Sequence, residues 1–213
     1  MTTELAVLEE DLEQLKFSKP KKYKNGEIMI SKIKKGSDPI LVQFPKMLIA
    51  SDYAKFVELE FTSESGYSKK VYNFLSKLDD YLMTVISKNS EEWFGKQIPM
   101  ENINVMYNKF IKAPKSSENK CTINFVFDKK KSQLINKKDE ELDVSELVKG
   151  NTLECISQLK YIVFSKETCF VNWEITTAKL HKKMVKVQKF GFVEDPTEQL
   201  SDSDTDEENL TFW

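Results

Sequence analysis

The last twenty residues, 194–213, limit what this chain can fold into, because they hold eight carboxylates and no lysine. A segment with so much charge of one sign and so few apolar residues cannot bury enough surface to form a core, so we expect it to be disordered. It nevertheless ends in Leu-Thr-Phe-Trp, which places two large aromatic rings at the end of a polyanion. The fold must therefore be built by the rest of the chain.

The charges are segregated along the sequence. The chain has 32 basic and 34 acidic residues, a net charge of −2, but eight of the acids lie in 194–213, so residues 1–193 carry a net charge of +6. Five further acids and no base lie in 4–13, which leaves 14–193 at +11. This acid–base–acid order indicates a middle region that binds a polyanion and an internal competitor for the same surface.

All 32 basic residues are lysine. A lysine ammonium is a mobile point charge, whereas the arginine guanidinium reads phosphates and guanine edges through a fixed fork. The surface is therefore suited to following a nucleic-acid backbone without reading its sequence. An AT-rich coding sequence would also replace arginine by lysine, but it would not segregate the charges.

Length and composition favour one folded domain, since 213 residues with 40% hydrophobic and 11% aromatic content can fill a substantial core. No apolar run approaches the roughly 20 residues that cross a bilayer, and the acidic N-terminus lacks the basic start and apolar centre of a signal peptide. We therefore expect a soluble, intracellular protein. Cys121, Cys155 and Cys169 show no metal-ligand spacing and are expected to be buried and reduced.

Hydrophobic periodicity predicts the elements. Leucines at steps of three and four from Leu5 to Leu15 predict an amphipathic, acidic helix at the N-terminus. An apolar stripe at helical spacing from Val71 to Ile86 predicts one long helix that ends near Asn89. Segment 105–111 fits either a helix or a strand. Period-two patterns and β-branched or aromatic runs predict strands at 28–33, 40–44, 56–61, 121–127, 153–164, 168–177 and 185–192.

This order of elements predicts a mainly β fold with an inserted helix. Five to seven short strands interrupted by one long helix are typical of a small antiparallel barrel of the oligonucleotide-binding (OB) type, although sandwiches and α+β sheets fit the same count. The predicted organisation is an acidic N-terminal helix at 1–18, an OB-like nucleic-acid-binding domain at 19–193 and a disordered acidic tail at 194–213.

Motifs for catalysis are absent from the sequence. The chain contains no GxGxxG, GxxxxGK[ST] or GxSxG, and its single histidine, His181, is flanked by lysines. The acid pair Asp79 and Asp80 is best interpreted as solvated charge, because neighbours in sequence do not converge on a substrate. We expect neither an enzyme nor a cofactor or metal site.

Lysines and aromatic residues are interleaved in several segments. Ammonium groups follow phosphates while aromatic rings stack on unpaired bases, which is the combination that single-stranded nucleic acid requires. For any single residue the alternative is that the ring fills the core and the lysine covers the surface; the clusters together with the acidic tail favour binding. The candidate binding residues are Lys21, Lys22, Tyr23, Lys24, Trp93, Phe94, Lys96, Tyr107, Lys109, Phe110, Lys129, Lys130, Lys131, Lys182, Lys183 and Lys186.

The ending from Asp202 to Trp213 resembles the acidic, aromatic-terminated tails of replicative single-stranded-DNA-binding proteins of bacteria and short-tailed phages. The order of the body, with Trp-Phe-Gly at 93–95 before a late hairpin, is similar to the phage type and to its suspected relatives in large eukaryotic DNA viruses. The resemblance implies an OB barrel that coats exposed DNA, in the host cytoplasm or nucleus, and a tail that recruits polymerase and helicase or primase. The tail residues implied are Asp202, Asp204, Asp206, Glu207, Glu208, Phe212 and Trp213.

We therefore expect a non-enzymatic protein that binds single-stranded DNA independently of sequence in viral DNA replication, recombination and repair, with a tail that competes with DNA. One alternative is a virion or scaffold interaction protein with acidic docking segments. A second is a transcription-associated factor with an acidic, aromatic activation tail. The N-terminal leucines could pack on the barrel or form a homodimer.

Overall fold

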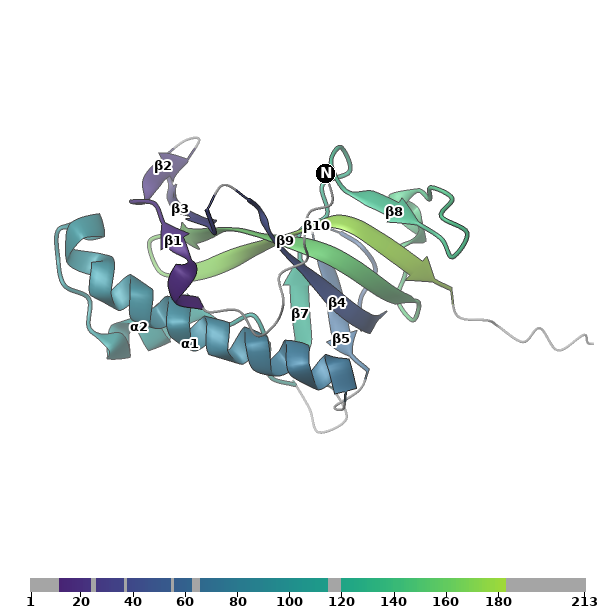
Figure 1. Cartoon of the computed structure of the whole chain (residues 1–213), viewed down its shortest axis with the longest axis horizontal. Coiled ribbons are helices and arrows are strands. Elements are labelled where there is room, and N and C mark those ends of the chain that lie inside the picture. The colour runs from purple at the N-terminus through teal and green to yellow at the C-terminus, as the bar shows by residue number, and fades with distance from the viewer. Residues whose placement is uncertain are drawn as a thin grey trace, which may run out of the picture. The chain divides into compact units, whose positions relative to one another are not determined.

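The structure is a computed structural model that describes residues 12–23, 26–36, 38–54, 56–62, 66–114 and 120–182 (Figure 1). The prediction of a mainly β fold with an inserted helix is confirmed. The described residues form two α-helices, α1 (Gly66–Phe94) and α2 (Met100–Met106), and the 3-10 turns η1 (Leu12–Gln14) and η2 (Val144–Glu146). The strands are β1 (Lys16–Phe17), β2 (Lys21–Tyr23), β3 (Ile28–Lys34), β4 (Ile40–Ile49), β5 (Val57–Phe61), β6 (Tyr107–Asn108), β7 (Thr122–Phe125), β8 (Gln133–Ile135), β9 (Thr152–Phe164) and β10 (Cys169–His181).

Strand β9 is the centre of the sheet. It pairs antiparallel with β10 along one edge and with β3 and β4 along the other, and β4 continues through β5 to β7. The regular ladder does not close into a barrel. An isolated parallel bridge between Val126 and Glu174 brings the end of β7 against β10, so five strands form a partly open circuit, as in OB folds.

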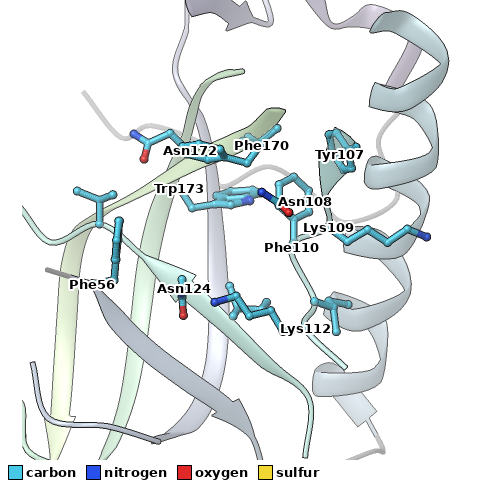
Figure 2. Close-up of a pocket in the computed structure, with 14 residues that line it drawn as sticks. Phe56, Tyr107, Asn108, Lys109, Phe110, Lys112, Asn124, Phe170, Asn172 and Trp173 are labelled. Atoms are coloured by element: carbon cyan, nitrogen blue, oxygen red, sulfur yellow. The ribbon is translucent and has the colours of Figure 1, made fainter. Parts of the chain in front are cut away.

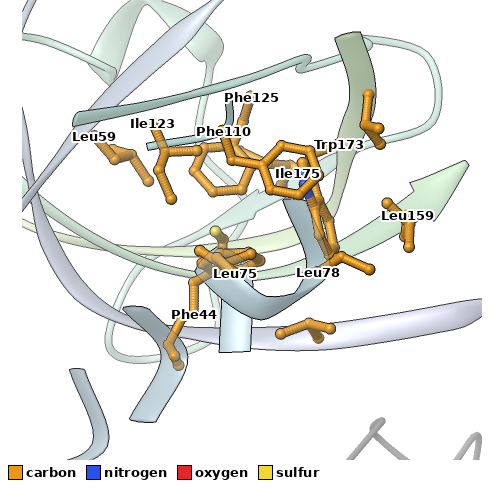
Figure 3. Packing of buried hydrophobic residues seen from close by; sticks show 14 of the residues in the cluster. Phe44, Leu59, Leu75, Leu78, Phe110, Ile123, Phe125, Leu159, Trp173 and Ile175 are labelled. Carbon is orange, nitrogen blue, oxygen red and sulfur yellow. The ribbon is translucent and has the colours of Figure 1, made fainter. Parts of the chain in front are cut away.

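Aromatic rings fill the space enclosed by this circuit. Trp173 of β10 lies edge-on to Phe44 of β4, with ring centroids 5.4 Å apart, and Phe44 lies edge-on to Phe125 of β7 at 4.7 Å (Figure 3). Phe110 also lies edge-on to Trp173, with ring centroids 5.7 Å apart. Each pair has the edge-to-face geometry that aromatic quadrupoles favour. The core is therefore held by rings from three strands and one loop.

Helix α1 covers this core with its predicted apolar stripe, and Leu75 and Leu78 lie near Phe44 (Figure 3). The predicted end near Asn89 is wrong, because the helix continues to Phe94. Asn89 Nδ2 donates to Val85 O and Ser90 Oγ to Ser87 O, so both polar side chains bond within the helix instead of interrupting it.

The predicted N-terminal helix is wrong in the part that the structure describes. Residues 12–14 form the 3-10 turn η1, and β1 follows and pairs with the edge of β3. The ring of Phe17 also contacts Tyr81 of α1, with ring centroids 6.3 Å apart. Residues 1–11 and 183–213, with the last predicted strand and the acidic tail, lie outside the described residues. Segment 105–111 contains the end of α2, the two residues of β6 and a loop at 109–111.

The three cysteines are free thiols. Cys155 and Cys169 are buried, as predicted, and Cys121 is half-buried. Burial raises the pKa of the Cys155 and Cys169 thiols to about 12, which keeps both thiols protonated. Within the described part of the chain, no helix is both long and apolar enough to cross a membrane.

Candidate nucleic-acid interface

The first cavity has a volume of about 640 Å³ and lies where β7, the start of β10 and segment 107–112 meet (Figure 2). Its described lining contains aromatic rings, amides and lysines but no acid. The lining residues are Phe56, Tyr107, Asn108, Lys109, Phe110, Ile111, Lys112, Ile123, Asn124, Val126, Phe170, Val171, Asn172 and Trp173.

The residues that line the first cavity include a partly exposed ring and two exposed lysines, of which Lys109 points away from Phe56 in Figure 2. Phe56, which follows β4 and precedes β5, is 39% exposed, and Phe170 of β10 is half-buried. Lys109 Nζ is 3.9 Å from Asp80 Oδ1, but both side chains are more than half exposed, so this ion pair is weak. The charge of Lys109 therefore stays available to an anion. Lys112 adds a second positive charge on the same segment.

A buried carboxylate anchors the wall that carries these lysines. Asp79 of α1 is 2% exposed and accepts a hydrogen bond from Tyr107 Oη at 2.8 Å and one from the Phe110 backbone N at 3.2 Å. Burial raises the pKa of Asp79 to about 7, although these two hydrogen bonds and Lys109 act to lower it. The interpretation of Asp79 as solvated charge is wrong.

The sequence held a signal for this buried acid. Asp79 lies four residues after Leu75 and three before Leu82, so helical spacing places it on the apolar face of α1. A charged residue on that face must be paired to be tolerated in a core. Its partners are 28 and 31 residues away, and the sequence gives no means of finding them.

The second cavity is a groove of about 810 Å³ around the end of α1 and the turn between β9 and β10. Lys22, Lys96 and Lys166 reach it from three separate segments. The other described lining residues are mainly apolar and include one acid: Gly26, Glu27, Met29, Ile86, Phe94, Gln97, Ile98, Pro99, Asn102, Ile103, Val105, Met106, Phe164, Ser165 and Cys169. The predicted residues Lys22, Phe94 and Lys96 therefore come together here.

Three predicted binding residues are core residues instead. Trp93, Tyr107 and Phe110 are each at most 6% exposed. Trp93 packs edge-on against Phe94 and Phe164, and Phe110 packs against Trp173, so these rings have no free face for a base. Composition alone could not separate rings that fill the core from rings at the surface.

The remaining predicted lysines that the structure describes line neither cavity. Lys129 Nζ lies 5.9 Å from the ring centroid of Tyr53, in the range of a cation–π contact, and Lys131 pairs with Asp128 at 2.9 Å. Lys130 shares their turn, and Lys182 pairs with Glu146 at 2.7 Å. Lys21 and Tyr23 are exposed on β2. Lys24, Lys183, Lys186 and the tail residues lie outside the described residues.

Several residues of the first cavity were missed. The sequence predicts Phe56 as a strand residue, and it does not mark Phe170, Asn108, Asn124 or Asn172 as binding residues. An amide in a strand carries no recognisable sequence signal, because only the fold shows that three of them face one space. No group of three or more histidine, cysteine or acidic residues is placed to hold a metal ion in the ranges that the structure describes.

Sequence comparison identifies a family for this chain. The pattern of a family of unknown function, DUF5871, matches residues 54–194. The chain belongs to this family. No curated protein matches the sequence. Because the first cavity is lined by residues between Phe56 and Trp173, it lies wholly within the segment shared with DUF5871, whereas the second cavity also uses Lys22 and Met29 from outside it.

Solved structures of phage proteins are similar to this DUF5871 member. The gp2.5 single-stranded-DNA-binding protein of bacteriophage T7 is 11% identical, with a TM-score of 0.48 over 71% of this chain and 97% of that chain. A C-terminal truncation of the single-stranded-DNA-binding protein of bacteriophage Enc34 is 16% identical, with a TM-score of 0.42 over 82% and 98%. The Enc34 protein in complex with single-stranded DNA is 16% identical, with a TM-score of 0.41 over 79% of this chain and 96% of that chain.

Proposed function

We propose that this protein binds single-stranded DNA, without catalysis and with little sequence selectivity, through a surface that includes the first cavity. The observation that carries the proposal is the combination of an exposed ring, Phe56, with Lys109 and Lys112 around an acid-free cavity. Stacking of unpaired bases on such a ring and neutralisation of phosphates by such cations are the two contributions that hold single strands.

The geometry favours a flexible strand over a duplex. Lysines contribute point charges without the guanidinium fork that reads base edges in a major groove, and the chain contains no arginine. Phe56 is partly exposed and can stack only on a base that is not already stacked in a duplex. The family resemblance of the tail, described from the sequence, points to the same ligand.

We further propose that the tail, 194–213, competes with DNA for the cationic surface and recruits replication proteins. A tethered polyanion acts at an effective concentration of the order of 1 mM, so it blocks weak ligands and yields to a long strand. Displacement would free Phe212 and Trp213 for a polymerase, or for a helicase or primase. Such a protein would work in viral DNA replication, recombination and repair, in the host cytoplasm or nucleus.

Titration of a fluorescein-labelled oligo-dT by the full-length protein, followed by anisotropy, tests the binding proposal. Phe56→Leu keeps an apolar side chain but removes the ring face, and we expect affinity to fall about 5-fold to 100-fold, the equivalent of about 1 to 3 kcal/mol of stacking. Phe56→Tyr should retain binding. For the double variant Lys109→Ala and Lys112→Ala, the slope of log K against log salt should fall by about 0.7 per lost phosphate contact.

Lys77→Ala is the matched control, because Lys77 is an exposed lysine of α1 that lines neither cavity. Its affinity and salt slope should equal those of the wild type. If Lys77→Ala lowers affinity and salt slope as much as the double variant of Lys109 and Lys112, binding is diffuse and not centred on the first cavity. Absence of oligo-dT binding would instead favour a virion or scaffold interaction protein.

A further inference from the structure

Two buried polar atoms of the first cavity have no hydrogen-bond partner among the described residues. They are the indole Nε1 of Trp173 and Oδ1 of Asn124. Both residues line the cavity, and Trp173 is 98% buried. Buried polar groups in folded proteins are nearly always paired, so an indole donor and an amide acceptor left open beside a cavity indicate a ligand that supplies the missing partners.

The rest of the lining fits a nucleobase. Asn108 and Asn172 add two further amides, each able to donate and accept, and the rim carries the Phe56 ring beside Lys112. Figure 2 shows Asn124 between Phe56 and Lys112 in that view, and Trp173 next to Asn108. A volume of about 640 Å³ is within the range of small-molecule sites. A planar, polar-edged ring with a phosphate attached matches this arrangement of amides, rings and cations.

We propose that the first cavity is a pocket for one nucleobase turned out of the bound strand. The Trp173 indole donates to a carbonyl oxygen of the base, and the Asn124 amide completes the contact with the base edge. This inference rests on the proposed single-strand binding and adds a position at which the strand is read.

The donor at the floor of the pocket defines a preference. Thymine, guanine and cytosine carry an exocyclic carbonyl oxygen that projects beyond the ring, whereas the acceptors of adenine are ring nitrogens that lie within the ring outline. The Trp173 Nε1 donor is recessed among core rings, so a projecting oxygen reaches it and a ring nitrogen does not. The desolvated donor therefore gains no partner when adenine occupies the pocket, which disfavours adenine. Binding is therefore tolerant of sequence along most of the strand and selective against adenine at the pocket.

NMR of the full-length protein labelled with ¹⁵N in its tryptophan indoles tests the contact directly. The Trp173 resonance is assigned by its NOEs to the rings of Phe44 and Phe110, and that of Trp93 by its NOEs to Phe94 and Phe164. The probes are oligo-dT, oligo-dA and an abasic strand of the same length. Oligo-dT should move the resonance of the Trp173 indole proton downfield. The abasic strand should leave that resonance in place. The Trp93 resonance serves as internal reference.

The variant Asn124→Ala gives a second readout. Stacking within oligo-dA weakens its binding to many proteins, so the wild-type ratio of the dT and dA affinities is not diagnostic alone. The Asn124 amide holds the base edge so that its carbonyl oxygen meets the Trp173 donor. Loss of the Asn124 contact should therefore reduce that ratio about 5-fold or more, the scale of discrimination by a paired base edge. Phe56→Leu, which removes a stacking face, should weaken both strands equally and leave the ratio unchanged.

The outcomes separate the two proposals. If oligo-dT binds but leaves the Trp173 indole unmoved, and Asn124→Ala keeps the wild-type ratio, the base pocket is overturned while single-strand binding stands. If no strand binds, single-strand binding fails and the pocket fails with it. A Trp173 shift that the abasic strand reproduces would show that the backbone and not a base reaches the cavity, which also overturns the pocket.

Discussion

At the scale of single residues, Asp79 connects the core to the candidate interface. Its carboxylate is buried in α1 and holds Tyr107 and the backbone of Phe110, which begin the segment that carries Lys109 and Lys112. A buried acid that binds two donors from one loop fixes that loop more firmly than apolar contact alone, because the donors would otherwise be left unpaired.

Stability should depend on pH through this carboxyl group. Its pKa rises from 3.8 to about 7 on folding, so the folded state holds the proton more tightly and stability falls as the pH rises through about 7. Between pH 5 and pH 8 we expect the wild type to lose about 2 to 3 kcal/mol more unfolding free energy than Asp79→Asn, which cannot titrate. Urea unfolding at the two pH values measures this difference.

Asp80→Asn is the control for this measurement, because Asp80 is the adjacent acid and its side chain is 68% exposed. Its pH dependence should match that of the wild type. If Asp79→Asn and the wild type lose the same stability between pH 5 and pH 8, the carboxyl group of Asp79 is not protonated in the folded chain near neutral pH.

At the scale of elements, Gly95 ends the long helix. Its φ of 73° lies in the left-handed region, and its backbone N donates to Glu91 O at 2.8 Å. An added Cβ would meet nothing within 4 Å, so the cost of replacing this glycine is confined to the backbone.

Gly95→Ala should therefore lower the unfolding free energy by about 1 kcal/mol. Gly95→Asn should lose less unfolding free energy than Gly95→Ala, because asparagine tolerates the left-handed conformation. Chemical denaturation of the three proteins under one condition measures the order. Equal stability of Gly95→Ala and the wild type would show that α1 can end without this conformation.

Most of the helices and strands could be predicted from the sequence. The alternation of apolar and polar residues in strands and the apolar stripe of α1 are local patterns. The failures have two different physical causes. Residues 89–90 stay helical because their side chains bond to backbone carbonyls of their own helix, a local effect that the residue types do not reveal. Lys16–Phe17 becomes a strand because β3 offers an edge, so tertiary pairing overrode local pattern there.

At the scale of the whole molecule, the first cavity could not be foreseen because its walls come from distant parts of the chain. Phe56 follows β4, Lys112 follows β6, and Asn172 lies on β10. The sequence indicated the right residue types, lysine and aromatic, but assigned buried rings such as Tyr107 to the surface and missed the amides. Only the folded sheet shows which of these side chains share one space.

Removal of 194–213 should strengthen DNA binding. For a tail that binds the cationic surface with a dissociation constant of about 0.1 mM at an effective concentration of about 1 mM, affinity for oligo-dT should rise about tenfold at low salt. The gain should shrink at high salt, because both competitors bind through charge. Anisotropy titrations at two salt concentrations measure it.

The double variant Phe212→Ala and Trp213→Ala keeps all the carboxylates and is the matched control. It should bind DNA as the wild type does and should lose only the capture of replication proteins. Unchanged DNA affinity after deletion of 194–213 would show that the tail does not compete for the DNA surface.

A short contact between the end of β7 and β10 completes the circuit of five strands. Two backbone hydrogen bonds at Val126, to Trp173 and from Ile175, join the strands there, whereas β10 pairs with β9 along its entire length. Val126 and Trp173 also border the first cavity. Separation of β7 from β10 at Val126 would break these two hydrogen bonds and enlarge the first cavity, while the hairpin of β9 and β10 stays paired.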